Sequence, residues 1–176
     1  MKQGLTHVYY GNGKGKTTAA LGLGMRAWGC GLQVVLVQFL KDFSTGELKA
    51  LAQLPGFTVL RGKAKGKLFS RDMSEDEKDA TTSIHEANLK QALSLVNTGK
   101  CDLLILDEAL DAYQLGLLGD AILRPLIEEK PGELELVITG HAPVEWVLNR
   151  ADYVTEMVKQ KHPYDRGIGA RRGIEF

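Results

Sequence analysis

Apolar residues follow two alternating patterns along this chain. Short, nearly continuous apolar runs, such as VVLVQFL at residues 34–40, are typical of strands that helices cover on both faces. Between these runs, apolar residues recur at the three- and four-residue spacing of helices. We expect strands at residues 5–10, 33–40, 57–62, 101–109, 133–140 and 152–157, and helices at 16–28, 45–55, 74–98, 118–129 and 143–149.

Strands that alternate with helices are typical of parallel βαβ units with right-handed crossovers. The 176 residues suit one domain of ordinary size, and no linker, internal repeat or low-complexity segment divides them. The pattern therefore predicts a single α/β domain over residues 1–176, with a mostly parallel central sheet flanked by helices.

Two polar segments differ from this regular pattern. Residues 63–79 contain few apolar side chains, and we expect their first part to be a mobile loop; Ser74 followed by Glu77 is a capping-box signature that starts the long helix. Residues 159–176 are rich in glycine and basic side chains. A disordered tail is one interpretation, whereas the turn signals Pro163 and Gly167 favour an ordered flap.

Charge and composition exclude several classes of protein. Lys plus Arg and Asp plus Glu both number 22, which disfavours a strongly basic nucleic-acid binder. Cys30 and Cys101 are not spaced like metal ligands, and we expect both to be small buried hydrophobes in a reducing compartment. No charged-then-apolar leader precedes Leu5, and no apolar run approaches the ~20 residues of a membrane span. We therefore expect a cytoplasmic protein with no membrane or nucleic-acid partner.

A glycine-rich stretch, GNGKGKTT at residues 11–18, lies between the first expected strand and helix. It differs from the phosphate-binding pattern G-x-x-x-x-G-K-[ST] in one respect, since its first glycine comes one residue late and Tyr10 stands in its place. The amides of such a loop and the positive end of the next helix bind phosphate. We expect nucleotide binding by Gly11, Asn12, Gly13, Lys14, Gly15, Lys16, Thr17 and Thr18; a plain tight turn is the alternative.

The late glycine has a chemical consequence. Shortening the arch changes which amides point inward, and it places Lys14 beside Lys16. Two lysines and a magnesium ion suit an unusually large negative charge, such as triphosphate as a leaving group. The alternative is that Lys14 is merely solvated.

The run LLILDE at residues 103–108 brings two acids to the end of a buried strand. Ligands of open α/β sheets bind outside the carboxyl ends of the strands. Asp107 or Glu108 would there face Thr17 and hold Mg²⁺, directly or through water. A helix cap is the competing role for Asp107.

Seven stretches, in order and over nearly the whole chain, resemble the P-loop family of cob(I)alamin, or cob(I)yrinic acid a,c-diamide, adenosyltransferases. The combination of GNGKGKTT with a terminal GIEF is highly specific for that family. The matching stretches are GNGKGKTTAALG at 11–22, VVLVQFLK at 34–41, LLILDE at 103–108, VITG at 137–140, ADYVTEM at 151–157, KHPYDRGI at 161–168 and RRGIEF at 171–176.

This resemblance implies a RecA-like P-loop fold, usually dimeric, that acts in cobalamin biosynthesis. It implies transfer of the 5′-deoxyadenosyl group of ATP to Co(I) of a corrinoid, with release of triphosphate and with a flavoprotein as candidate reductant. By motif, residues 11–18 would bind triphosphate, and Thr17 with Asp107 or Glu108 would bind Mg²⁺. Lys14 and Lys16 would stabilise the departing charge, and no side chain is required as acid or base.

The same resemblance suggests ligand-binding roles for further residues. Arg26 matches an arginine position of the family pattern, and a surface salt bridge is its alternative role. In the flap, Lys161, His162 and Arg171 would approach the nucleotide or the corrinoid carboxamides.

Two departures from the family pattern concern candidate ligand contacts. Many members carry a Phe-Trp pair after the third strand, where this chain has GKLFSRD, so Phe69 is the candidate for the corrinoid side; a loop aromatic tucked into the core is its alternative. The family's TGR is TGH here. A neutral His141 cannot replace a guanidinium fork, and we expect it to be a simple polar loop residue.

Two other functions compete with adenosyl transfer. An ordinary P-loop ATPase or kinase would release phosphate or ADP instead of triphosphate. A non-catalytic ATP- or corrinoid-binding module would bind both ligands without forming a cobalt–carbon bond. An assay of the products separates these cases.

Overall fold

A computed structural model describes residues 3–41, 43–62 and 73–175 of the chain. Its sheet contains the strands β1 (Thr6–Tyr10), β2 (Val34–Gln38), β3 (Phe57–Arg61), β4 (Leu103–Asp107), β5 (Glu135–Gly140) and β6 (Tyr153–Glu156). Its helices are α1 (Lys16–Gly29), α2 (Gly46–Leu51), α3 (Glu75–Asn97), α4 (Ala109–Gln114), α5 (Asp120–Glu128) and α6 (Glu145–Leu148), followed by the 3-10 turn η2 (Pro163–Arg166).

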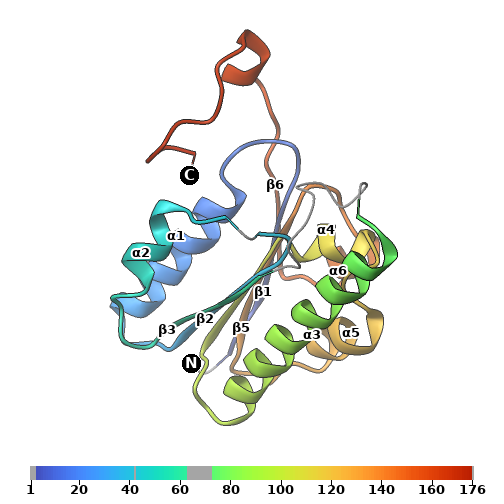
Figure 1. Ribbon diagram of the computed structural model, residues 1–176. Coiled ribbons are helices and arrows are strands. Elements are labelled where there is room, and N and C mark those ends of the chain that lie inside the picture. The colour runs from blue at the N-terminus through green and yellow to red at the C-terminus, as the bar shows by residue number, and fades with distance from the viewer. Residues whose placement is uncertain (1–2, 42, 63–72, 176) are drawn as a thin grey trace.

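The six strands form one sheet in the order β3-β2-β4-β5-β1-β6, and every pair is parallel. Helices α1 and α2 lie on one side of the sheet, and α3 and α5 lie on the other (Figure 1). This is the α/β architecture of a RecA-like P-loop fold, as predicted, and the sheet is wholly parallel within the described residues.

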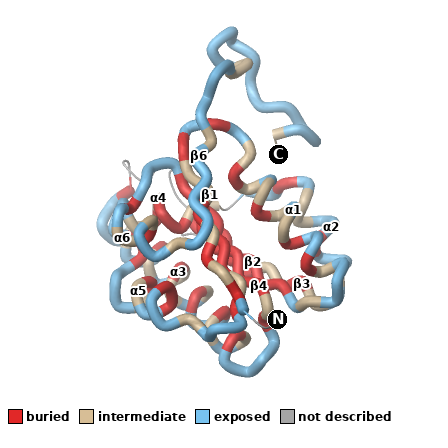
Figure 2. Tube along the Cα trace, turned by 180° about the vertical axis from the view of Figure 1, so that it is seen from behind, coloured by how far each residue is buried: buried red, intermediate tan, exposed pale blue. Residues whose placement is uncertain are grey.

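Alternate strand residues contribute to two cores, one on each face of the sheet. On the first face, Ala20 and Ala27 of α1 pack with Leu36 and Ile105. On the second face, Leu89 of α3 belongs to the same cluster as residues from α4 and α5 and the remaining strand positions. Because β2 and β4 are buried on both faces, they read as continuous apolar runs (Figure 2).

Most predicted elements are confirmed, and two expectations need correction. No helix was predicted between the strand at 101–109 and the helix at 118–129, but α4 begins at Ala109, two residues after the end of β4; its six residues are too short to show a helical period. Cys30 was expected to be buried, but it is exposed at the C-cap of α1, whereas Cys101 is buried.

The two polar segments behave differently. The capping box of Ser74 and Glu77 is present at the start of α3, so residues 75–79 are helical. The expected mobile loop, with Phe69, otherwise falls on residues 63–72, outside the described residues. The C-terminal segment, predicted as a flap, forms η2 and two turns, and it projects beyond the sheet edge before curving back toward the glycine loop (Figure 1).

A parallel sheet places all carboxyl ends of its strands at one edge. The glycine loop follows β1 there, Lys41 follows β2 shortly after its end, Glu108 follows β4, and His141 follows β5. Among the described residues, no helix is long and apolar enough to cross a membrane.

Candidate functional site

The shortened glycine loop is pressed against the backbone that leaves β6. The amide of Gly13 donates to the carbonyl of Met157 at 2.6 Å, and the amide of Gly11 donates to the carbonyl of His141 at 2.9 Å. A β-carbon at Gly11 or Gly13 would lie 2.4 or 2.7 Å from the Met157 carbonyl oxygen. Both positions therefore require glycine, and two amides of the arch are already used inside the protein.

The rest of the loop is arranged to receive an anion. Gly15 caps α1 in a left-handed conformation with φ 116° and no side-chain cap. Within the described chain, the amides of Lys14, Gly15 and Lys16 have no hydrogen-bond partner. The buried Lys16 ammonium donates to the carbonyls of Gly11 and Gly13, at 2.7 and 2.9 Å, so it lies under the arch. Free amides, a helix N-terminus and a lysine together favour phosphate binding.

Asp107 lies at the centre of a buried polar network. Its Oδ1 accepts from the hydroxyls of Thr17 and Thr139, at 2.8 and 2.9 Å. Its Oδ2 accepts from Gln38 at 3.2 Å and from the ammonium of Lys41 at 2.6 Å. The carboxyl is fully buried, so this network and the Lys41 charge offset its desolvation.

The donor set around Thr17 and Asp107 fits a magnesium ion. Both are hard oxygen donors, as Mg²⁺ requires. The amide oxygen of Gln38, whose NH₂ group donates to Asp107, is buried and without a hydrogen-bond partner in the described chain. Thr17 and Asp107 are the residues that would hold such an ion. The geometry thus brings together Thr17 and Asp107, two of the three predicted metal ligands.

The third predicted ligand, Glu108, points to different partners. Its backbone is left-handed, with φ 62°, and its carboxylate lies 3.7 Å from Lys41 and 3.5 Å from Nδ1 of His141. Its role as a metal ligand stays a prediction.

His141 differs from its prediction. Its Nδ1 lies 3.2 Å from Asp111, and hydrogen bonds with Asp111 and then Glu108 raise the pKa of His141 to about 10. These two carboxylates favour the protonated ring, and His141 is thus held in a network of side chains, whereas we expected a simple polar loop residue. The protonated ring keeps the positive charge of an arginine without the forked donors. Asp111, from the unexpected helix α4, is the physical reason.

The C-terminal segment is tied to the loop at two points. Asn12 accepts a hydrogen bond from the amide of Lys159 at 2.9 Å, and Lys14 forms an ion pair with Glu175 at 3.2 Å. Lys14 is thus half exposed and paired with Glu175, and its role at the phosphates stays a prediction. Hydrogen bonds from Arg171 and, to a smaller extent, Lys14 hold the pKa of Glu175 at about 2, which keeps it ionised.

The other predicted residues are spread around this centre. Lys161 and His162 line a cavity of about 620 Å³ within the C-terminal segment. Thr18 is exposed in the first turn of α1. Arg26 is exposed in the last turn of that helix, roughly 15 Å along the axis from Lys16 at 1.5 Å per residue, and its role stays a prediction.

Sequence reasoning did not single out three residues that complete the site. Lys41 stands inside the quoted stretch VVLVQFLK, and Gln38 is a polar residue in an otherwise apolar strand, which is a signal for a buried polar contact. Met157 meets Gly11 and Gly13 through its backbone, and its sulfur lies 3.6 Å from where a β-carbon of Gly15 would be, so the close contacts with the loop do not depend on its residue type.

Comparison with known proteins identifies the family. Residues 2–176 match the ATP:corrinoid adenosyltransferase family BtuR/CobO/CobP. A corrinoid adenosyltransferase of Pseudomonas aeruginosa is 34% identical over 99% of this chain and 85% of its own length. Those of Sinorhizobium sp and Escherichia coli K12 are each 33% identical over 99% of this chain, and over 81% and 87% of their own lengths. The sheet order, the glycine loop and these similarities agree, and the chain belongs to the ATP:corrinoid adenosyltransferase family.

Proposed function

We propose that this protein transfers the 5′-deoxyadenosyl group of ATP to Co(I) of a corrinoid and releases triphosphate. Family membership supports corrinoid adenosyl transfer in general. The observation that supports this particular reaction is the shortened arch, in which the amides of Gly11 and Gly13 donate to the carbonyls of His141 and Met157 and are not free to bind phosphate.

That arrangement favours an altered nucleotide pose. Phosphate oxygens would be held by the free amides of Lys14, Gly15 and Lys16, nearer the start of α1 than in a loop whose whole arch is available. A shift of the polyphosphate along the loop brings a different atom of ATP to the open side. We infer that this atom is carbon 5′ and that the terminal phosphorus is held inside the loop.

The transfer needs positioning and charge stabilisation more than proton transfer. Co(I) supplies both electrons of the new cobalt–carbon bond, the bond between carbon 5′ and oxygen breaks, and its electron pair leaves with triphosphate. In-line geometry and cations near the departing oxygens lower the barrier. Lys16 is suited to this task, and Lys14 becomes available if its exposed pair with Glu175 opens.

Thr17 and Asp107 would hold Mg²⁺, with Glu108 as a further candidate. When bound, the ion neutralises polyphosphate charge and polarises its oxygens. The hydrogen bonds of Asp107 to Thr139 and Gln38 orient its carboxylate toward Thr17.

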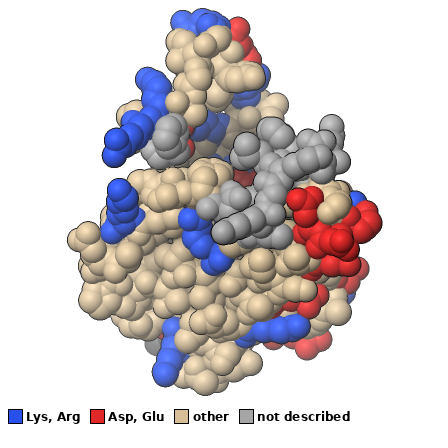
Figure 3. All heavy atoms as spheres, viewed as in Figure 1, with Lys and Arg blue, Asp and Glu red and all other residues tan. Residues whose placement is uncertain are grey.

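The C-terminal segment is the proposed corrinoid side. It contains Lys159, Lys161, Arg166, Arg171 and Arg172, and Figure 3 shows Lys and Arg side chains, with some Asp and Glu, on the projecting part of the molecule that this segment forms in Figure 1. The cavity lined by Lys161 and His162 offers donors that suit carboxamide oxygens. Phe69 remains the candidate for an apolar contact with the corrinoid face. Cob(I)alamin and cob(I)yrinic acid a,c-diamide are the two acceptors to compare.

One assay tests the reaction. The protein is mixed with ATP, Mg²⁺ and chemically reduced cobalamin, and the ultraviolet–visible change of cobalt alkylation is followed while the phosphate products are separated. We expect alkylation with one triphosphate per corrinoid, and Lys16→Ala should lose both activity and ATP binding. Release of phosphate or ADP without alkylation would instead indicate an ATPase, and binding without products would indicate a carrier.

We also propose a cytoplasmic homodimer that receives electrons from a flavoprotein. Sedimentation at assay concentration tests the dimer. Replacement of the chemical reductant by a reduced flavoprotein tests the electron source, because alkylation should continue without added chemical reductant.

A further inference from the structure

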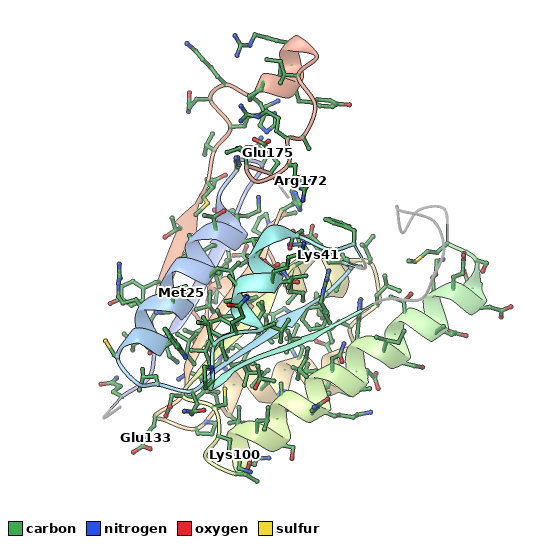
Figure 4. All side chains as sticks on the ribbon, turned by 60° about the vertical axis from the view of Figure 1, so that its left-hand side comes forward. Met25, Lys41, Lys100, Glu133, Arg172 and Glu175 are labelled. Atoms are coloured by element: carbon green, nitrogen blue, oxygen red, sulfur yellow. The ribbon has the colours of Figure 1, made fainter. Side chains whose placement is uncertain are left out.

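The ammonium of Lys41 lies where the metal ligands converge. Its Nζ is 2.6 Å from Asp107, 3.2 Å from the hydroxyl of Thr17 and 3.7 Å from Glu108. These are the three residues that the sequence predicted as ligands of Mg²⁺. Figure 4 shows Lys41 at the edge of the sheet below the C-terminal residues Arg172 and Glu175, with Lys100 and Glu133 at the opposite end.

The backbone that carries Lys41 is held in a costly conformation. Leu40 has φ 59°, and within the described chain it shares a positive φ with one other non-glycine residue, Glu108. Such strain persists where surrounding contacts determine it, and it is concentrated at functional sites. The two strained residues follow β2 and β4, immediately beside Lys41 and Asp107.

A buried histidine determines the strained turn. The amide of Leu40 donates to Nε2 of His85 at 3.2 Å, and Nδ1 of His85 donates to the carbonyl of Leu117 at 3.0 Å. The amide of Phe39 also donates to the carbonyl of Asp107 at 3.0 Å. The backbone beside Lys41 is thus fixed on two sides, and the flexible lysine stem is the part able to move.

An ammonium and a divalent cation cannot both occupy the space between Thr17 and Asp107, since they would repel each other at contact distance. We propose that Lys41 is a tethered cation of the nucleotide site: it holds Thr17 and Asp107 together before ligand binds, and it moves onto the polyphosphate when the metal enters with ATP. Free metal must displace Lys41 unaided. The metal–nucleotide complex supplies phosphate oxygens that receive the ammonium.

This inference rests on the proposed nucleotide and metal site, but not on adenosyl transfer. It predicts opposite effects of one substitution. Lys41→Gln should strengthen binding of free Mn²⁺ by about tenfold or more, the size of effect that one close charge has on proton binding. The same substitution should weaken binding of ATP in the presence of Mg²⁺, because a cation that contacts phosphate is lost.

The experiment uses the full chain without corrinoid. Electron paramagnetic resonance of unbound Mn²⁺ measures metal affinity for the parent protein, Lys41→Gln and Lys49→Gln, a matched control at an exposed lysine of α2. The double variant Lys41→Gln, Asp107→Asn should lose the added affinity, which assigns it to this site. Calorimetry gives the ATP affinity of the same proteins.

Lys41→Gln leaves the buried carboxylate of Asp107 without its ion-pair partner, which lowers stability. Thermal melting with and without Mn²⁺ therefore provides a second measurement for a variant that folds poorly. Mn²⁺ should then raise the melting temperature of this variant more than that of the parent protein. Equal Mn²⁺ affinities and equal metal-induced shifts would overturn the proposal, and an unchanged ATP affinity would overturn the movement onto polyphosphate. A protein that binds Mn²⁺ as expected but does not alkylate cobalt would contradict the proposed function alone.

Discussion

At the scale of single residues, glycine positions control the shape of the nucleotide loop. A β-carbon at Gly13 would meet the carbonyl oxygen of Met157 at 2.7 Å, which is backbone and cannot turn aside. Gly22, in the middle of α1, has open space at the corresponding position. The two glycines therefore respond differently to the same methyl group.

Gly13→Ala should weaken ATP binding at least ~10-fold, an effect of about 1.4 kcal/mol, because the arch must separate from the β6 exit. Gly22→Ala should leave binding unchanged and stabilise the protein by about 1 kcal/mol through helix propensity. Calorimetric titration with ATP and urea unfolding measure the two effects. Equal ATP affinities in both variants would contradict the tight contact.

His85 makes stability depend on pH. Burial lowers the pKa of His85 below 6.5, against the opposing hydrogen bond to Leu117, so the unfolded chain binds a proton more readily than the folded one. The free energy of unfolding should fall as the pH falls below about 6.5, by at most about 1.4 kcal/mol per unit. His85→Gln should flatten this part of the profile in urea unfolding between pH 7 and 5. The control His162→Gln, in the C-terminal segment, should keep the parent slope.

At the scale of elements, α1 and α3 begin in opposite ways. Ser74 and Glu77 satisfy amides at the start of α3 through a capping box, with contacts of 2.7 and 3.3 Å. Gly15 gives α1 no side-chain cap. Among the described α-helices only α3 has a side-chain cap, and α1 is the uncapped helix that follows the glycine loop, where a bound phosphate would complete the bonds that a cap would otherwise make.

Ser74→Ala should cost about 1 kcal/mol of stability, because the first turn of α3 loses an acceptor. Ser83 lies exposed in the middle of the same helix, and Ser83→Ala should be neutral or stabilising by up to about 0.5 kcal/mol. Urea unfolding of both variants measures the difference. A Ser74→Ala protein as stable as Ser83→Ala would show that the box contributes nothing.

At the scale of the whole molecule, the parallel sheet brings distant segments to one edge. The C-terminal segment returns to this edge, but its residues are largely exposed (Figure 2) and it is held by contacts such as Lys14–Glu175. Exposed ion pairs contribute little to global stability, yet they can decide how often a peripheral segment opens.

Glu175→Gln should accelerate limited trypsin cleavage after Arg171 and Arg172 several-fold without lowering the melting temperature. The reason is that both Arg171 and Lys14 lose their ionised partner. Glu133→Gln, at the far end of the sheet (Figure 4), should be cleaved like the parent protein. The measurement is the rate at which the intact chain disappears, and identical rates in the two variants would exclude an anchoring role for Glu175.

Local pattern determined much of this protein. Apolar runs specified the buried strands, the Ser74–Glu77 pair specified the start of α3, and glycines beside lysine and threonine specified an anion loop, because these features depend on neighbours a few residues apart. The late glycine likewise marked an unusual arch. The short helix α4 left no periodic signal, so its Asp111, the partner of His141, escaped prediction.

Tertiary structure decided what lies beside these motifs. The charge of His141, the contact of Gly13 with Met157, and the ammonium of Lys41 between Thr17 and Asp107 all join segments that are distant in the chain. The sheet order creates these neighbours: hydrogen bonds with Asp111 and Glu108 raise the pKa of His141, and the carbonyl of Met157 excludes a side chain at Gly13. Residue types along the chain indicated a nucleotide site. The packing of parallel strands decided that the Lys41 ammonium lies in it and that the amides of Gly11 and Gly13 are already hydrogen-bonded within the protein.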